Sequence, residues 1–164
     1  MRVELINTGS ELLLGIVQNT HAVYLAEALF PLGLLIARQT TVPDGDDIIE
    51  VLGEAAGRAG IVLVTGGLGP TNDDRTRDAA ARVFGCELRR DDGLLEGLRR
   101  RFAERGLGIN EHIARQAMVP EGAEVLPNPN GSAPGLYFAP RGGRPAVFLL
   151  PGPPRELRPM VTDH

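Results

Sequence analysis

A short strand that is apolar on both faces and runs straight into a glycine-rich loop is the feature that most constrains the fold. Residues 61–65 read Ile-Val-Leu-Val-Thr, and Gly66-Gly67-Leu68-Gly69-Pro70-Thr71 follows at once. A strand without a polar face has to be covered on both sides, as the central strands of parallel sheets are by helices. The sequence therefore predicts an α/β fold with this strand in the middle of the sheet.

Short apolar runs alternate with helical patterns along the rest of the chain, which is typical of parallel βαβ units. Before the central strand we expect strands at residues 2–8 and 34–42, each followed by an amphipathic helix. Beyond the loop, the pattern predicts helices at 75–84, 91–105 and 110–117, then strands at 123–126, 135–139 and 145–150. Gly142-Gly143 favours a hairpin between the last two strands, so part of the sheet is expected to be antiparallel.

The composition suits one globular domain. The 164 residues are 43% hydrophobic and carry a formal net charge of −4, so the chain can bury a core but lacks the basic face of a nucleic-acid binder. No apolar run approaches the ~20 residues that span a bilayer, and the N-terminus has no signal-peptide pattern. The single cysteine, Cys86, cannot form an internal disulfide. We therefore expect a cytoplasmic protein with a buried, structural thiol.

The glycine loop joins the carboxyl end of a strand to the start of a helix, which is where ligands bind in open α/β sheets. Glycines adopt positive φ angles and bring successive N–H groups toward an anion, and a helix N-terminus adds partial positive charge. The spacing matches neither the Walker loop nor the dinucleotide fingerprint. A tight turn without a ligand explains the glycines equally well, so this loop alone leaves the choice open.

Two adjacent carboxylates, Asp73 and Asp74, follow the loop and strengthen the case for a ligand. One of them can cap the next helix by accepting its free N–H groups, which leaves the other at the mouth of the phosphate site. There it would repel phosphate unless a divalent cation such as Mg²⁺ lay between them. We expect Asp74 to face the ligand with Asp73 assisting. Thr71 and Thr76 offer hydroxyls nearby, which local backbone groups can equally use.

Loops that follow the other strands should converge on this one, because the carboxyl ends of parallel strands share an edge. Gly9-Ser10-Glu11 follows the first strand, and Glu11 is either a metal or ribose ligand or a solvent-facing residue at a helix start. Asp44 follows the second strand within Pro43-Asp44-Gly45, which taken alone is turn chemistry.

Two later loops offer small residues near the same edge. Gly131-Ser132-Ala133-Pro134-Gly135 suits close approach of the backbone to a ligand. Gly152-Pro153 lies between a buried strand and a last helix. That turn is either a second anion site with Arg155 or a rigid corner.

Taken together, these segments resemble the N-terminal domain of the competence/damage-inducible protein A (CinA) family, which is similar to molybdopterin-binding domains of the MogA/MoaB type. The resemblance covers essentially the whole chain. The matching segments are residues 8–15 (TGSELLLG), 19–20 (NT), 65–74 (TGGLGPTNDD), 116–123 (QAMVPEGA), 126–129 (LPNP), 131–135 (GSAPG) and 150–156 (LPGPPRE). So many ordered matches are specific in a way that one glycine loop is not.

The resemblance implies a three-layer αβα sandwich, mostly parallel with an antiparallel part, and a nucleotide or pterin ligand that bears phosphate. In molybdopterin adenylyltransferases one important aspartate follows a proline after the second strand, and another precedes Val-Thr after the glycine loop. Asp44 and Asp74 occupy those places here, with Arg75-Thr76 in place of Val-Thr, so the resemblance assigns Asp44 to the site. Leu68, where that relative usually has Thr, and Asp73, where it often has a basic residue, favour a metal site over a molybdopterin site.

CinA-type N-terminal domains are associated with hydrolysis of ADP-ribose to AMP and ribose 5-phosphate. We therefore expect a metal-dependent nucleotide pyrophosphatase, whose glycine loop and neighbouring loops hold the pyrophosphate. Asp74, with Asp73 or Asp44 and with Glu11, would hold Mg²⁺, Mn²⁺ or Co²⁺. The alternatives are a molybdopterin-binding or molybdopterin adenylyltransferase domain, and a regulatory nucleotide-binding module without catalysis.

Full-length members of the family often carry a C-terminal nicotinamide-mononucleotide deamidase domain. This chain ends at His164, just inside a new element. We expect residues 1–164 to be a single domain and a fragment of a longer chain, and we assign it no deamidase activity. The relatives form dimers or trimers, so we expect a homo-oligomer without a nucleic-acid or membrane partner.

Overall fold

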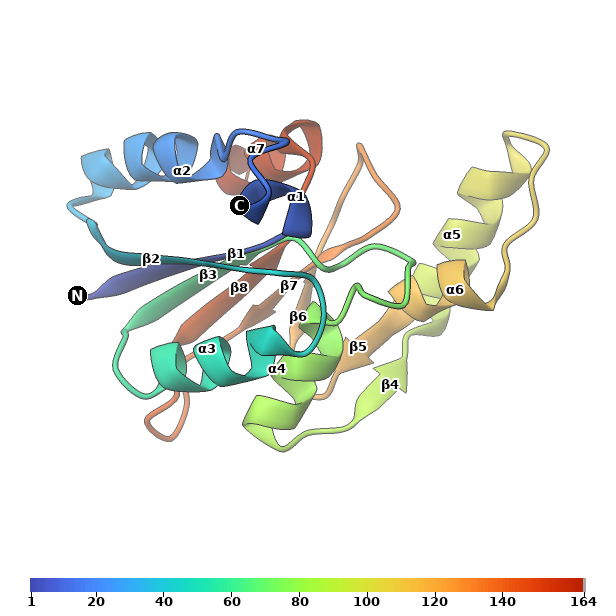
Figure 1. The fold of residues 1–164 in the computed structure, drawn as a ribbon. Coiled ribbons are helices and arrows are strands. Elements are labelled where there is room, and N and C mark those ends of the chain that lie inside the picture. Colours follow the sequence, from blue (N-terminus) through green and yellow to red (C-terminus); the bar gives the residue numbers. More distant parts are fainter. Residues whose placement is uncertain (164) are drawn as a thin grey trace.

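A computed structural model describes residues 1–163 and arranges them in three layers (Figure 1). The middle layer is a six-stranded sheet in the order β2-β1-β3-β8-β7-β6. Helices α2 (His21–Leu29) and α7 (Pro154–Asp163) cover one face, and α3 (Asp47–Ala56) and α4 (Thr76–Phe84) cover the other. The predicted three-layer αβα fold is confirmed, with the apolar strand in the interior of the sheet.

The strands end together along one edge of the sheet. The parallel strands are β1 (Val3–Thr8), β2 (Ile36–Val42), β3 (Ile61–Thr65) and β8 (Ala146–Leu150). Their register places Thr8 beside Val42 and Thr65 beside both Asn7 and Leu150. The antiparallel part consists of β7 (Gly135–Phe138), which pairs with β8, and β6 (Glu124–Leu126). The loops that follow β1, β2, β3 and β8 therefore meet at the same edge.

A lateral lobe, built from residues 88–120, was not expected in this form. Its two-stranded sheet pairs β4 (Leu88–Arg90) with β5 (Met118–Pro120), and its helical part comprises α5 (Asp92–Ala103), α6 (Glu111–Ala114) and a 3-10 turn, η2 (Arg115–Ala117). Figure 1 shows α5, α6, β4 and β5 to one side of the main sheet, and the lobe has its own small core of Leu95, Leu98 and Ala117. Neither Leu88-Arg89-Arg90 nor Met118-Val119-Pro120 alternates between apolar and polar residues, so neither strand was predicted from the sequence.

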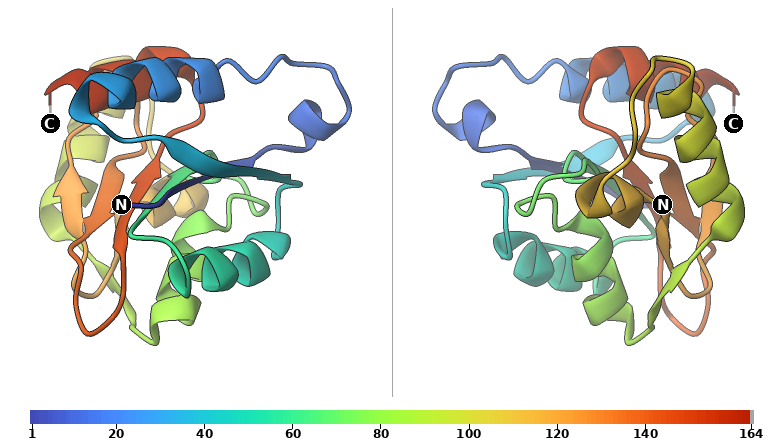
Figure 2. Two further views of the ribbon diagram at one scale, coloured as in Figure 1. Left: turned by 90° about the vertical axis from the view of Figure 1, so that its left-hand side faces the viewer. Right: turned by 90° about the vertical axis from the view of Figure 1, so that its right-hand side faces the viewer.

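Two short segments near the N-terminus also escaped prediction. They are α1 (Ser10–Leu13) and the 3-10 turn η1 (Phe30–Leu32), which ends α2. Figure 2 shows α1 on a loop that projects from the rest of the domain. Within residues 1–163 no helix is both long enough and apolar enough to cross a membrane.

The core forms on both faces of the sheet because side chains alternate along each strand. In β3, Val62 and Val64 pack toward α3 and α4, whereas Leu63 packs toward α2 and α7. All three are buried, as expected for a strand apolar on both faces. Cys86 is half-buried rather than fully buried, and burial raises the pKa of its thiol. A thiol that holds its proton is a poor nucleophile, which agrees with a structural role.

One charged residue, Glu4, lies within the core at β1. It is only 2% exposed, and its carboxylate accepts hydrogen bonds from Nε and Nη2 of Arg58 at 2.9 and 3.0 Å. Arg2 adds a third cationic contact at 3.2 Å. The bonds from Arg58 lower the pKa of Glu4 below its ordinary value, against the opposing effect of burial. A buried carboxylate is tolerated only when it is paired in this way.

This pair makes a specific contribution to the pH dependence of stability. Because the pKa of Glu4 is lowered on folding, the stabilisation is present above the unfolded-state pKa and is lost as the pH falls through the folded-state value. We expect Glu4→Gln to destabilise the domain more at about pH 7 than at about pH 3. Urea unfolding at both pH values measures this. Glu54→Gln removes the exposed partner of Arg58 and should show no such difference; equal effects of Glu4→Gln at the two pH values would contradict the prediction.

Candidate functional site

A cavity of about 310 Å³ lies where the four loops meet at the carboxyl ends of the parallel strands. The structure brings twelve of the predicted site residues to its lining: Glu11, Asp44, Gly66, Gly67, Leu68, Gly69, Pro70, Asp74, Ser132, Ala133, Gly152 and Pro153. Four further residues complete the wall: Thr8, Gln116, Pro151 and Glu156. We call this cavity the main chamber.

The glycine loop turns sharply over the end of β1. Gly66 and Gly67 have φ angles of 93° and 66°, a left-handed conformation that favours glycine. A Cβ on Gly66 would lie 2.5 Å from the carbonyl oxygen of Thr8 and 2.7 Å from its hydroxyl. The Gly66 N–H donates to the carbonyl of Leu150 at 3.0 Å. The loop therefore ties the ends of β1, β3 and β8 together, and only glycine fits at its first position.

Two residues at the start of α4 fasten this loop from behind. The Thr76 hydroxyl donates to the Gly66 carbonyl at 2.9 Å, and the Arg77 guanidinium donates to the carbonyls of Leu68 and Gly69 at 2.7 and 3.0 Å. Both side chains are buried, and neither lines the main chamber. Burial lowers the pKa of Arg77 to about 10, although Asp74 acts in the opposite direction. Arg77 thus stays cationic at neutral pH, and Thr76 serves the loop rather than the cavity.

The loop leaves backbone donors unused at the cavity. Within residues 1–163 the amides of Gly67, Leu68 and Gly69 donate to no protein acceptor. Successive unpaired N–H groups in a left-handed turn form a concavity that favours anions. The side chain of Leu68 is 1% exposed and belongs to the main core, so this residue offers a ligand its backbone only. This explains why an apolar residue stands in the middle of a polar loop.

The two loop aspartates take different positions, and neither caps α4. The helix begins at Thr76 after Arg75, and no side chain caps it, so the expectation of an aspartate cap was wrong. Oδ2 of Asp74 instead accepts the Thr71 amide at 2.8 Å and the Thr71 hydroxyl. Asp74 lines the main chamber, whereas Asp73 and Thr71 are exposed and lie outside its lining. The nearby Thr71 side chain and the backbone N–H of Asp73 lower the pKa of Asp73.

Asp44 is held by the loop that follows β1. The Ser10 amide donates to Asp44 Oδ2 at 2.9 Å, and the Asp44 amide donates to the Ser10 hydroxyl oxygen at 3.2 Å. The Gly9 amide adds a bond to the carbonyl of Val42 at 3.1 Å. Gly9 and Ser10 do not line the cavity themselves. Their contribution is to fix Asp44, while the neighbouring Glu11 reaches the lining.

The main chamber is strongly acidic. Four carboxylates line it, from Glu11, Asp44, Asp74 and Glu156, and none of its lining residues is Arg or His. Within residues 1–163 no three His, Cys, Asp or Glu side chains are close enough together to hold a metal by themselves. A divalent cation would therefore need a ligand's oxygens as well as one or two of these carboxylates, which is how Mg²⁺ is commonly bound.

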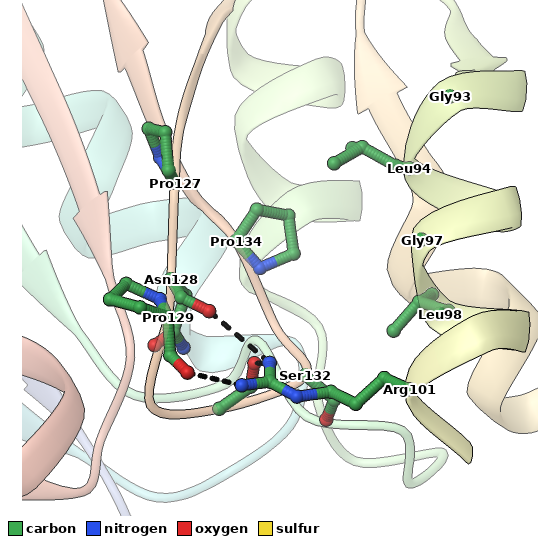
Figure 3. A pocket seen from close by; sticks show the side chains of 11 residues that line it. Gly93, Leu94, Gly97, Leu98, Arg101, Pro127, Asn128, Pro129, Ser132 and Pro134 are labelled. Atoms are coloured by element: carbon green, nitrogen blue, oxygen red, sulfur yellow. Dashed lines mark hydrogen bonds between the residues drawn. The ribbon is translucent and has the colours of Figure 1, made fainter. Parts of the chain in front are cut away.

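The opposite wall is a loop held by the lateral lobe. Arg101 of α5 reaches across a groove and donates to the carbonyls of Asn128, Pro129 and Gly131 (Figure 3). Nδ2 of Asn128 then donates to the Ala133 carbonyl at 2.7 Å and to Glu156 Oε2 at 2.8 Å. Three predicted loop residues, Gly131, Ser132 and Pro134, line this groove of about 340 Å³, and Gly135 begins β7. Only Ser132 and Ala133 reach the main chamber.

Two polar residues that line the main chamber, Thr8 and Gln116, were not predicted as site residues from the sequence. They are 8% and 1% exposed, and Thr8 Oγ1 and Gln116 Oε1 have no hydrogen-bond partner. A buried polar atom left unsatisfied costs about 1–3 kcal/mol, so such atoms in a cavity wall point to a ligand or water that pairs with them. Both residues stand in segments that carry the family resemblance, which was the available signal.

Comparison with known proteins agrees with this architecture. The sequence profile of a family described as "Probable molybdopterin binding domain" matches residues 4–164. A CinA-like protein of Akkermansia muciniphila is 53% identical over 98% of this chain, and one of Myxococcus xanthus is 46% identical over the whole chain. The chain spans 39% of the length of each of these two relatives.

Solved structures give the same result. The protein CinA from Thermoplasma acidophilum, described as of unknown function, superposes with a TM-score of 0.89 and 31% identity, over 99% of this chain and 94% of that one. The molybdopterin biosynthesis enzyme MoaB from Thermus thermophilus superposes with a TM-score of 0.62 and 24% identity, over 98% and 86%. The second likeness concerns the fold alone. The chain therefore belongs to the family of probable molybdopterin binding domains, among its CinA-like members.

The left-handed turn can be tested by adding one methyl group. We expect Gly66→Ala to lower the free energy of unfolding by about 2–5 kcal/mol, because the added Cβ overlaps Thr8 and the φ angle is unfavourable for alanine. Chemical denaturation followed by circular dichroism measures the change. Gly53→Ala, in α3 with open space around it, is the matched control and should be neutral or stabilise by up to about 1 kcal/mol. Equal stabilities of the two variants would rule out the proposed constraint.

Proposed function

We propose that the main chamber binds a phosphate-bearing pterin or nucleotide together with a divalent cation. The observation that carries this proposal is the combination of unpaired loop amides with four carboxylates and no cationic side chain in one cavity wall. Amides alone favour an anion, whereas the carboxylates repel one. A cation between phosphate and carboxylate resolves this conflict.

The amides of Gly67, Leu68 and Gly69 are the proposed donors to the phosphate oxygens. Asp74 is the first candidate for the cation, because it lines the chamber next to the glycine loop and its carboxylate is held by Thr71. Asp44 and Glu11 are the further candidates, whereas exposed Asp73 is a weaker one. When bound, the cation would neutralise phosphate charge and lower the pKa of a coordinated water.

A phosphorylated pterin is the first candidate ligand, supported by the family match. The amino-pyrimidinone edge of a pterin presents adjacent N–H donors, and a carboxylate accepts two such bonds side by side. Glu156 and Asp44 are suitable acceptors, since each already has its position fixed by a hydrogen bond from a neighbouring loop. Adenylylation of the pterin with ATP would use the same phosphate donors and the same cation.

The second candidate function is hydrolysis of pyrophosphates of the ADP-ribose type. ADP-ribose itself is the test substrate. The observation that favours it is a further cavity that adjoins the main chamber and shares four lining residues with it, which suits a ligand with groups on both sides of its phosphates. In that reaction the loop amides would stabilise charge on the pyrophosphate, and a carboxylate of the chamber would orient the attacking water.

The two candidates are separated by one set of measurements. Calorimetry with molybdopterin and with ADP-ribose, each with Mg²⁺ and with a chelator, tests cation-dependent binding. We expect at least one ligand to bind, and to weaken by tenfold or more without the cation. Release of AMP from ADP-ribose with Mg²⁺, Mn²⁺ or Co²⁺ would support hydrolysis, and ADP-ribose bound without turnover would support a regulatory module. Cation-independent binding of both ligands would refute the proposal.

Asp74→Asn tests the cation ligand directly. Asparagine keeps the shape and an oxygen that accepts from Thr71, but it lacks the charge that binds the cation. We expect ligand affinity or turnover to fall by two orders of magnitude, or roughly 3 kcal/mol, with an unchanged melting temperature. Asp92→Asn, an exposed residue of α5 paired with Arg90, is the matched control. Asp73→Asn in the same series decides between the two adjacent carboxylates. Full activity of Asp74→Asn would remove this residue from the site.

A further inference from the structure

The hairpin between β7 and β8 carries two arginines that the proposed function does not use. The chain turns there at Gly142-Gly143, so the hairpin predicted from this dipeptide is confirmed. Figure 1 shows the turn at the start of β8, whereas the main chamber lies beyond the end of the same strand. The five residues of β8 keep the two places about 16 Å apart, at the usual rise of an extended strand.

The turn is tight and sets the two arginines opposite each other. Gly142 and Gly143 have φ angles of 58° and 85°, as a two-residue hairpin turn requires. The Arg141 amide donates to the Arg144 carbonyl at 3.3 Å, and the Arg144 amide donates to the Arg141 carbonyl at 3.0 Å. Residues paired in this way share one face of the hairpin, with Cβ atoms about 5 Å apart. Like charges in such a pair destabilise it, and an anion between them removes that cost.

The guanidinium of Arg144 has a fixed position. Its Cζ lies 5.1 Å from the ring centroids of both Phe84 and Phe138, and Nη2 donates to the Ala139 carbonyl at 3.2 Å. Nε is buried, whereas Nη1 is accessible and has no hydrogen-bond partner among residues 1–163. A side chain that is already ordered loses little conformational entropy when it binds a ligand.

Both arginines line a cavity of about 980 Å³ and lack a carboxylate partner. Among residues 1–163 neither Arg141 nor Arg144 forms an ion pair. The two carboxylates of the cavity belong to the segments that flank the lateral lobe: Glu121 pairs with Arg89 at 3.2 Å, and Glu87 is exposed. Two cations at the hairpin are therefore left without a counter-ion.

We propose that this cavity, here called the hairpin site, binds the phosphate group of a phosphate ester through Arg141 and Arg144. A phosphate group carries close to two negative charges near neutral pH and three free oxygens, so it can accept from both guanidiniums at once. The cavity measures about 980 Å³ against about 310 Å³ for the main chamber, which leaves room for the rest of the ester. Because the protein itself supplies the cations, binding here needs no metal. The inference is independent of the function proposed for the main chamber.

The test is a titration with glycerol 3-phosphate in a chelator and at low ionic strength, where exposed charges are least screened. Nuclear magnetic resonance follows the backbone amides of Gly142 and Gly143. We expect these amides to shift with a dissociation constant of about 1 mM or below. Glycerol, which lacks the phosphate, should leave them in place. The amides of residues 67–69 report on the main chamber and should not shift without a divalent cation.

Two variants assign the binding to the hairpin. Arg141→Gln changes an exposed residue and should weaken binding at least about tenfold, because a hydrogen bond to a charged group is lost. Its melting temperature should hold or rise, since the like-charge pair is relieved. Arg144→Lys keeps the charge but loses the planar fork, and it should also bind more weakly. Arg105→Gln, an exposed residue of the lateral lobe, is the matched control and should bind normally. Arg141→Gln also removes the contribution of this site from calorimetry of the main chamber.

Several results would overturn the hairpin site. They are the absence of a shift at about 10 mM ester, an unchanged affinity in Arg141→Gln, and an equal loss of affinity in Arg105→Gln. Tighter binding of succinate, a dicarboxylate of similar charge, would replace the phosphate ester and overturn the assignment as well. If the amides of residues 67–69 stayed in place even with Mg²⁺ while those of the hairpin shifted, the function proposed for the main chamber would fail and the hairpin site would stand.

Discussion

The left-handed turn at Gly66-Gly67, packed against the end of β1, is the contact on which the rest of the site depends. Its first residue lies so close to Thr8 that no side chain fits, and its amide is bonded to Leu150 of β8. Three strand ends are thereby held at fixed separation. Among residues 1–163 the following amides, those of Gly67, Leu68 and Gly69, have no protein acceptor. A buried backbone N–H group without a hydrogen-bond partner destabilises the fold, and a ligand or water that accepts its hydrogen bond removes this penalty.

Charge is divided between the two sides of this loop. Behind it, the buried Arg77 cation is used on the carbonyls of Leu68 and Gly69, and Asp74 and Asp78 help to keep it charged. In front of it, the charged side chains that line the main chamber are all carboxylates. The cation therefore stabilises the loop's shape and is not available to a phosphate. This division is why an anion-binding turn and an acidic cavity coexist, and why a divalent cation enters the proposed function.

The lateral lobe contributes more than its small core suggests. Its helix α5 provides Arg101, whose guanidinium donates to the carbonyls of Asn128, Pro129 and Gly131 in the loop before β7. That loop in turn positions Glu156 through Asn128. The lobe also supplies Gln116, which reaches the main chamber from η2. One side of the cavity is thus built by loops that follow the parallel strands, and the other by Gln116 and by a loop that the lateral lobe holds in place.

The sequence by itself determined the fold class and the edge of the sheet at which the candidate site lies. The apolar run of β3 required a covered central strand, and the glycines after it required a turn with positive φ angles, because both follow from local chemistry. Local pattern also brought Asp74 forward as a candidate, whereas Asp44 became one only through the family resemblance. The sequence also predicted that Asp74 rather than Asp73 faces the ligand. In the structure Asp74 lines the cavity and is bonded to Thr71, whereas Asp73 is exposed and lies outside the lining. Leu68 and Thr76 were expected to touch the ligand, yet packing against α3, α4 and Gly66 takes up their side chains. Thr8 and Gln116 were singled out only by the structure, in which segments far apart in the chain leave Thr8 Oγ1 and Gln116 Oε1 without partners. Tertiary structure alone decides such cases, because a hydrogen bond between distant segments depends on where the whole chain places both of them.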